Sequence, residues 1–197
     1  MKRALIILVT VIICGLGIGA LTYSGHVFGS SEEEHHFVGA VGGDNAYNRG
    51  QEPEDWWSEI KHMHGHVGPW NVLGWRIGKA ALREFDMKWG WHELDIICYI
   101  PLKTPYSCMA DGLVIGTGNT LGRLDIRMAE VVCLDLIQVC IHRKDGTGPV
   151  LIFKPRPAYL RHIDAPKPED LEKLSRECSN IKESELFEIK RITATKS

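Results

Sequence analysis

The sequence predicts an α+β domain, with helices packed on an antiparallel-leaning sheet, preceded by one N-terminal transmembrane helix. Two segments space their apolar residues as helices do, and several short β-rich runs are separated by Gly and Pro turns. An uncharged apolar run lies near the start of the chain. The formal net charge is −2, and no basic stripe is present, so we expect no nucleic-acid partner.

The apolar run indicates a membrane anchor. It extends from Ala4 to about Leu21, and ~18 residues is near the lower limit for a helix that spans the hydrocarbon core. Lys2 and Arg3 precede the run, and an acidic cluster at 32–34 follows it. By the positive-inside rule, we expect residues 1–23 to cross the cytoplasmic (inner) membrane once, with the N-terminus inside and the domain outside. A cleaved secretory signal is the alternative.

Residues 24–51 are rich in Gly, Ser, Glu and His, which is typical of a flexible linker. The folded domain is therefore predicted over residues 52–197. Its first helix begins after Pro53, with acids in the first turn, and ends at Gly65 and the Gly68-Pro69 pair. A second helix is predicted over about 70–85.

The second helix carries a regular apolar stripe, made by Leu73, Ile77, Ala80, Ala81 and Phe85. Gly74 and Gly78 lie four residues apart and would allow another backbone to approach closely. The remaining elements follow in order: a strand in "ELDIICYIPL", a short helix over 107–115, a glycine-rich turn over 116–122, two strands around the turn at 145–148, a surface helix in "EDLEKLSREC" and an edge strand in "ELFEIKRI".

The stretch "HMHGHVGP" contains the residues most suggestive of chemistry. A loop broken by glycine and proline can turn His64 and His66 toward one point, and neutral imidazole is a ligand for zinc and similar ions. A third ligand must come from elsewhere. His62 is a candidate general base.

Cys108 is the candidate third ligand. Six cysteines occur, at positions 14, 98, 108, 133, 140 and 178, and five lie outside the predicted span. An odd number outside indicates at least one unpaired or ligating thiol. Asp111 follows Cys108 by three residues, so on a helix it shares a face with it and either contacts the same ion or orients a histidine. The alternative for Cys108 is a small buried side chain. Cys98, Cys133 and Cys140 fit that role better, because each lies in an apolar run that reads as a strand.

Two arginines lie near the proposed site segments. Arg76 is on the second helix and Arg123 follows the glycine-rich turn, and both are candidates for binding an anionic ligand. The alternative is a surface or ion-paired arginine. "GTGNTLG" lacks the Gly-Lys-Ser/Thr end of a phosphate loop, which argues against nucleotide binding.

Taken together, these motifs resemble the E-type subunit family of formylmethanofuran dehydrogenase. The resemblance rests on His64-Gly65-His66-Val67-Gly68-Pro69, Leu73-Gly74-Trp75-Arg76, Ser107-Cys108 with Asp111-Gly112, and the turn from Thr117 to Arg123. It covers about residues 56–153, and it implies an α+β fold with an antiparallel sheet and a metal site, usually zinc, near the HGH loop and the later cysteine.

Three residues depart from the family pattern. Gly68 and Asn119 stand where many members have cysteine, and Arg123 replaces a lysine. The resemblance therefore leaves His64, His66, Cys108 and Asp111 as the ligand set. It does not imply methanofuran chemistry, because the family name comes from gene association.

These observations support three functional hypotheses. The leading one is a membrane-anchored domain that binds Zn²⁺, or another divalent transition metal, in an accessory or small-ligand-binding role. The second is an enzyme that uses an open coordination position. The third is a non-catalytic subunit or metallochaperone, docked to a membrane protein or to a second copy of itself through its tryptophan-rich region.

Overall fold

A computed structural model of the protein describes residues 50–193. The anchor expected over 1–23 and nearly all of the expected linker lie outside the described residues. Within 50–193, none of the helices combines the length and the apolar character needed to cross a membrane.

A five-stranded mixed sheet forms one layer of the domain. Its strand order is β2-β1-β3-β4-β5. The β1–β2 pair is parallel, with Ile96 opposite Ile126, and the other three pairs are antiparallel. The sheet is therefore mixed, and three of its four pairings are antiparallel, as an antiparallel-leaning sheet requires. The strands are β1 Leu94–Ile100, β2 Ile126–Glu130, β3 Gln138–Arg143, β4 Val150–Pro155 and β5 Phe187–Ile192.

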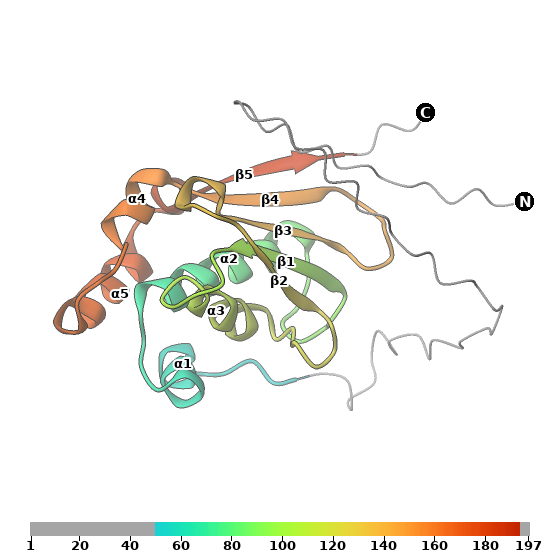
Figure 1. The fold of residues 1–197 in the computed structure, drawn as a ribbon. Coiled ribbons are helices and arrows are strands. Elements are labelled where there is room, and N and C mark those ends of the chain that lie inside the picture. The colour runs from blue at the N-terminus through green and yellow to red at the C-terminus, as the bar shows by residue number, and fades with distance from the viewer. Residues whose placement is uncertain (1–49, 194–197) are drawn as a thin grey trace, which may run out of the picture. The chain divides into compact units, whose positions relative to one another are not determined.

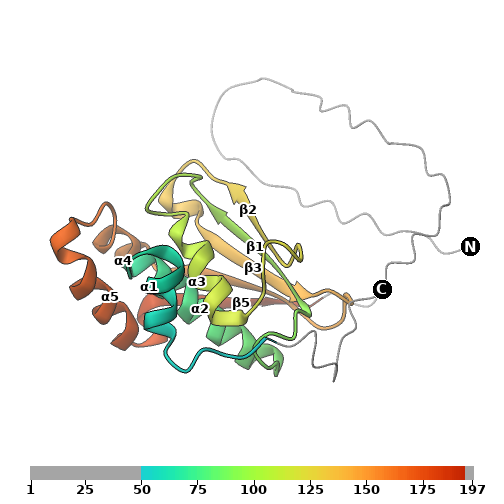
Figure 2. The same cartoon turned by 90° about the horizontal axis from the view of Figure 1, so that it is seen from below.

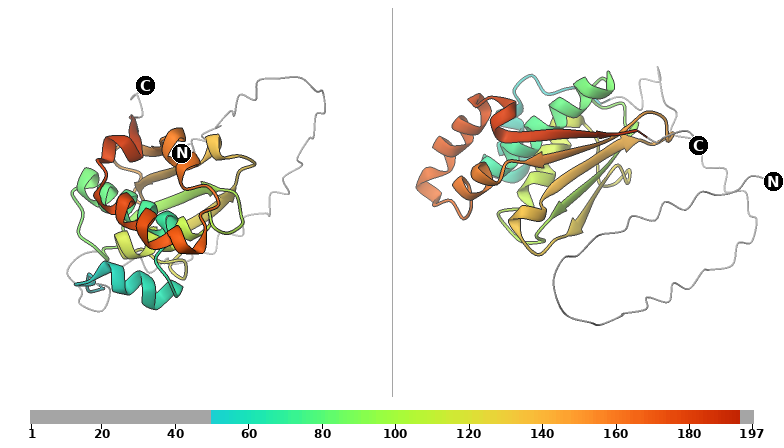
Figure 3. Two further views of the ribbon diagram at one scale, coloured as in Figure 1. Left: turned by 90° about the vertical axis from the view of Figure 1, so that its left-hand side faces the viewer. Right: turned by 90° about the horizontal axis from the view of Figure 1, so that it is seen from above.

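Helices cover one face of this sheet (Figure 1). The helices α2 and α3 form the layer next to the sheet, and α1 lies outside α3 (Figure 2). The C-terminal helices α4 and α5, orange to red, gather at one end of the strands (Figure 3). The helices are α1 Trp56–His64, α2 Pro69–Phe85, α3 Cys108–Thr117, α4 Pro157–His162, α5 Leu171–Asn180 and α6 Glu183–Leu186.

The core lies between the sheet and the α2–α3 layer. Side chains of β1 alternate between buried and half-buried, as expected of a strand covered on one face. The predicted apolar stripe of α2 is buried in full, with Leu73 and Ile77 completely inaccessible to solvent. Trp70, also buried, donates its indole N–H to the Ile163 carbonyl and thereby ties α2 to the segment after α4.

Glycines allow α2 and α3 to cross at very short range. A Cβ added at Gly74 would lie 2.0 Å from the Met109 carbonyl oxygen, and one added at Gly112 would lie 1.9 Å from the Asn71 carbonyl oxygen. No side chain fits at such distances, so the glycines at these positions permit backbone contact between the helices. This crossing fixes the position of α3 relative to the start of α2.

Most of the predicted elements are present. The two early helices, the first strand, the hairpin around 145–148, the surface helix and the edge strand β5 all form close to the expected bounds. Strand β2 and the short helices α4 and α6 were not predicted. Ser107 precedes α3 as expected, but its side chain makes no capping hydrogen bond. The strand expected around Cys133 was wrong, because this residue is exposed beside the short 3₁₀ turn Leu134–Leu136.

Candidate functional site

The HGH segment lies where α1 ends. His64 is the last residue of α1, and Gly65 ends the helix with φ = 88°, a left-handed conformation that favours glycine. His66 follows in the loop. Their ring centroids lie 4.8 Å apart, so the glycine turn brings the two imidazoles side by side.

Asp111 holds the ring of His64. Its Oδ2 lies 2.7 Å from His64 Nδ1, which joins the end of α1 to the first turn of α3. A carboxylate on Nδ1 favours the tautomer that leaves the Nε2 lone pair free. Asp111 therefore contacts a histidine, and its role toward a metal ion stays a prediction.

His66 is prepared to act as a neutral imidazole. His66 is exposed, but desolvation by its neighbours, and then the nearby His64, lower the pKa of His66 below its ordinary value. The neutral ring is the form that donates a lone pair to a metal ion.

Cys108 opens α3 and is buried. The buried side chain of Asn71 links it to the HGH loop: the amide nitrogen of Asn71 donates to the Cys108 carbonyl at 3.0 Å, and its Oδ1 accepts from the Gly68 N–H at 3.0 Å. Sequence reasoning missed Asn71. Its position, three residues after Gly68 at a helix start, was the available signal.

The thiol of Cys108 is held in its neutral form. Burial, and then the charge of Asp111, raise the pKa of Cys108 above its ordinary value. A thiol must lose its proton to ligate a metal, so binding at this residue requires the ion to displace that proton.

The four predicted ligands do not converge on one point that could hold a metal ion. Within residues 50–193, no group of three or more His, Cys, Asp or Glu side chains is placed to hold a metal ion. The two imidazoles are adjacent, and the Nδ1 of His64 contacts a carboxylate. Metal-ligating histidines usually have such a contact at the ring nitrogen that does not bind the metal. The structure does not place the sulfur of Cys108 with them in a group that could hold a metal ion, within the described residues.

Gly68 lies next to the ring of His66. A Cβ added at Gly68 would lie 3.6 Å from His66 Nε2 and 3.2 Å from the Asn71 Oδ1. A cysteine at this position, as in many members of the resembled family, would face His66. The glycine removes that sulfur from the site.

The remaining predicted site residues are Arg76, Arg123 and His62. Arg76 donates from Nη1 to three carbonyls at the end of α5, those of Cys178, Ser179 and Ile181, at 2.9–3.1 Å. It therefore caps α5. Arg123 is exposed in the turn before β2 and His62 is exposed on α1, so anion binding and general-base catalysis stay predictions.

The glycine-rich turn keeps its amides occupied. The amide of Gly118 donates to the Val114 carbonyl, that of Asn119 to Thr117 Oγ1 and that of Thr120 to Asp125 Oδ2. Asn119 is buried, and its side-chain amide donates to the Leu94 carbonyl at 2.8 Å. These three donors are used internally and are therefore not free to hold an anion.

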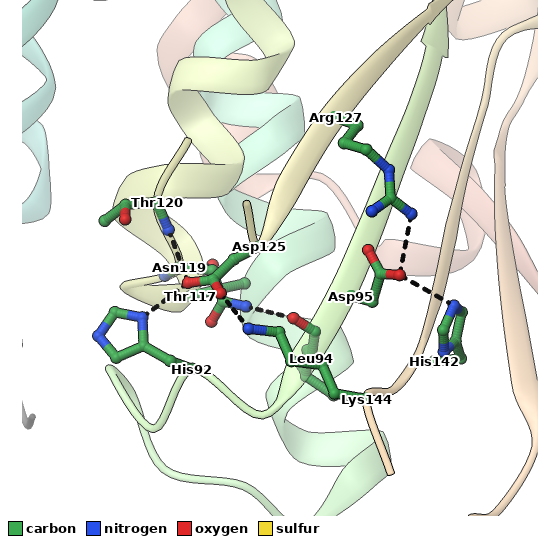
Figure 4. A network of polar contacts seen from close by, with 10 residues as sticks. All are labelled: His92, Leu94, Asp95, Thr117, Asn119, Thr120, Asp125, Arg127, His142 and Lys144. Atoms are coloured by element: carbon green, nitrogen blue, oxygen red, sulfur yellow. Dashed lines mark hydrogen bonds and ion pairs between the residues drawn. The ribbon is translucent and has the colours of Figure 1, made fainter. Parts of the chain in front are cut away.

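A buried carboxylate organises this turn (Figure 4). Asp125 is completely inaccessible to solvent and contacts His92 Nδ1 at 2.8 Å, the Lys144 ammonium and the Thr120 amide. This network could not be identified from the sequence, because its members are far apart in the chain. It joins the turn, the entry to β1 and the end of β3.

A search of curated proteins found no match. The family model described as "FmdE, Molybdenum formylmethanofuran dehydrogenase operon" matches residues 63–191, which is more than half of the chain and includes all four predicted metal ligands and both arginines. The chain therefore belongs to the FmdE family.

Proposed function

We propose that this protein is a membrane-anchored domain that binds a divalent transition metal, with zinc the first candidate, through His64, His66 and Cys108. Asp111 keeps the His64 Nε2 free to ligate. A metal bound by three protein ligands would keep a coordination position open for water or a small anion. The ion would act on that ligand as a Lewis acid. The residues after 23 belong, in this proposal, outside the cytoplasmic membrane.

The pairing of the imidazoles carries the proposal. The two ring centroids lie 4.8 Å apart, and a carboxylate oxygen lies 2.7 Å from Nδ1 of His64. Histidines that bind metals commonly have a carboxylate on the nitrogen that does not ligate. The lowered pKa of His66 supports the same role. Cys108 lies one helical turn before Asp111, at the positive end of the α3 dipole, which favours a thiolate once a metal displaces its proton.

Elemental analysis of the purified protein tests the proposal. We expect close to one transition-metal ion per chain in the wild type, and a loss of most of it in His66→Ala and Cys108→Ser. Cys133→Ser is the matched control, because Cys133 is exposed and lies outside the site. Wild-type metal content in both site variants would contradict the assignment.

An accessory subunit is a second candidate function, and a specific surface favours it. Five large apolar side chains are exposed within residues 121–136, around the edge strand β2, with Val132 91% exposed and Leu124 73% exposed. Exposed apolar groups gathered at one edge are typical of a protein-binding surface. They are Leu121, Leu124, Met128, Val132 and Leu136.

Co-purification from solubilised membranes tests this candidate. If β2 docks on a membrane partner, the double variant Met128→Glu with Val132→Glu loses the partner, whereas Ile192→Glu at the opposite edge of the sheet retains it. Recovery of the wild-type protein with no partner protein would contradict the accessory role.

A further inference from the structure

A pocket of about 470 Å³ lies beside the candidate site and belongs to none of the roles described above. Its wall is formed by the segment before α1, by Glu59 and Met63 of α1, and by the C-terminal end of α3. The volume is within the range of small-molecule sites. The pocket can therefore take a ligand of several heavy atoms.

The polar rim of this pocket is acidic. Glu52, Glu54 and Glu59 line it, and no Lys, Arg or His does. Glu52 is paired with Lys79, but within residues 50–193 neither Glu54 nor Glu59 has an ion-pair partner. Two carboxylates without a counterion favour a positively charged occupant.

The inner wall is aromatic and apolar. Trp89 donates its indole N–H to the Ile115 carbonyl at 2.8 Å, which holds the ring in place. Gly118 packs against it, since a Cβ there would lie 2.8 Å from the indole. Met63 and Val114 complete the apolar part. An apolar wall that contains an indole, beside carboxylates, is an environment suited to alkylammonium groups, by apolar contact and charge.

The carboxylates do not form a metal site. No three of the His, Cys, Asp and Glu side chains in the described part of the chain converge on one point, the three glutamates included. A bare divalent cation needs several oxygen ligands at close range. An organic cation needs only a charged rim and an apolar wall, and both are present.

We propose that this pocket binds the cationic end of an amphipathic amine, the small-molecule ligand of the adjoining metal site. The part of this proposal that makes the amine a ligand of the metal site rests on the proposed function. Asp111 and Ile115 lie one turn apart on α3, so about 6 Å of helix axis separates the histidine contact from the pocket wall. A molecule with its ammonium against Glu54 and Glu59 can extend toward His64.

A titration of the full-length protein, freed of metal by a chelator, tests the pocket. Butylammonium, pentanoate and 1-butanol are matched probes of similar size, and ligand-observed NMR measures weak binding of each. We expect butylammonium to bind saturably, and at least about tenfold more tightly than the other two. In Glu54→Gln with Glu59→Gln its Kd rises about threefold to tenfold.

The matched control is Glu169→Gln with Glu185→Gln, which changes the net charge equally at exposed residues outside the pocket. An unchanged Kd in the control supports the proposal. No saturable binding, equal binding of pentanoate or 1-butanol, an unchanged Kd in the pocket variant, or an equal loss in the control overturns it. Because the pocket includes no proposed metal ligand, failure of metal binding leaves this titration intact.

Discussion

Asp111 sets the chemistry of the site at the scale of single residues. Its carboxylate lies on His64 Nδ1, and both residues are held by helix ends that the glycine turn and the α2–α3 crossing bring together. The contact favours the His64 tautomer that leaves the lone pair on Nε2.

Replacing Asp111 tests this role directly. In Asp111→Asn, the metal affinity should fall about tenfold to a hundredfold, because the ring loses both its orientation and its charged acceptor. Competition with a chromophoric chelator measures the affinity. Asp135→Asn is the control, since Asp135 is exposed in the 3₁₀ turn after β2. Equal affinities in the two variants would show that Asp111 has no part in binding.

Asp125 is the second residue on which the structure depends. It is completely buried and accepts from His92, Lys144 and the Thr120 amide, so its removal leaves several polar groups without their partner. We expect Asp125→Asn to lower the free energy of unfolding by about 2–4 kcal/mol. Urea denaturation measures the change, and Asp135→Asn should stay within about 0.5 kcal/mol of the wild type. Equal stabilities would show that the network adds nothing.

At the scale of elements, the crossing of α2 and α3 places the site. The Gly112 Cα lies so near the Asn71 carbonyl that any side chain forces the helices apart. Because Asn71 also holds the HGH loop to Cys108, separation of the helices would separate the two halves of the proposed metal site.

The variant Gly112→Ala tests the crossing. It should lower the free energy of unfolding by about 3 kcal/mol or more, since overpacking against backbone has no flexible side chain to absorb it. Gly122→Ala is the matched control, because a Cβ there meets nothing within 4 Å. Denaturation of both variants in urea gives the comparison. A Gly112→Ala protein as stable as Gly122→Ala would contradict the close packing.

The elements differ in how far the sequence predicted them. Helix α2 was predictable because its apolar stripe and its Gly-Pro start are local signals. Strand β2 was missed because three of its five residues are exposed and its parallel partner is distant in sequence. The site divides in the same way. The histidines, Cys108 and Asp111 were proposed from short spacings, whereas the contacts of Asn71 and Asp125 and the pocket depend on segments that only the fold brings together.

The whole molecule buries several weakly acidic groups in neutral form. Burial raises the pKa of Cys98 and Tyr159 above their ordinary values, and it raises the pKa of Cys178 to about 12. In the unfolded chain these groups ionise at ordinary values of about 8.5 for Cys and about 10 for Tyr. Above those values the unfolded state binds fewer protons than the folded state, so stability falls as the pH rises.

Thermal unfolding at several pH values tests this linkage. The Tm should decline from about pH 9 toward pH 12, and Cys178→Ala should decline less steeply because one of the buried thiols is absent. Cys133→Ala, which removes an exposed thiol, should follow the wild-type curve. Identical slopes in the wild type and Cys178→Ala would contradict the linkage for this thiol.

X-ray absorption spectroscopy of the zinc-loaded full-length protein measures the proposed coordination itself. We expect a first shell with two imidazole nitrogens at about 2.0 Å and one sulfur at about 2.3 Å, with the sulfur lost in Cys108→Ser and one imidazole lost in His66→Ala. A shell of oxygen ligands alone, or one that neither substitution changes, would contradict the metal site.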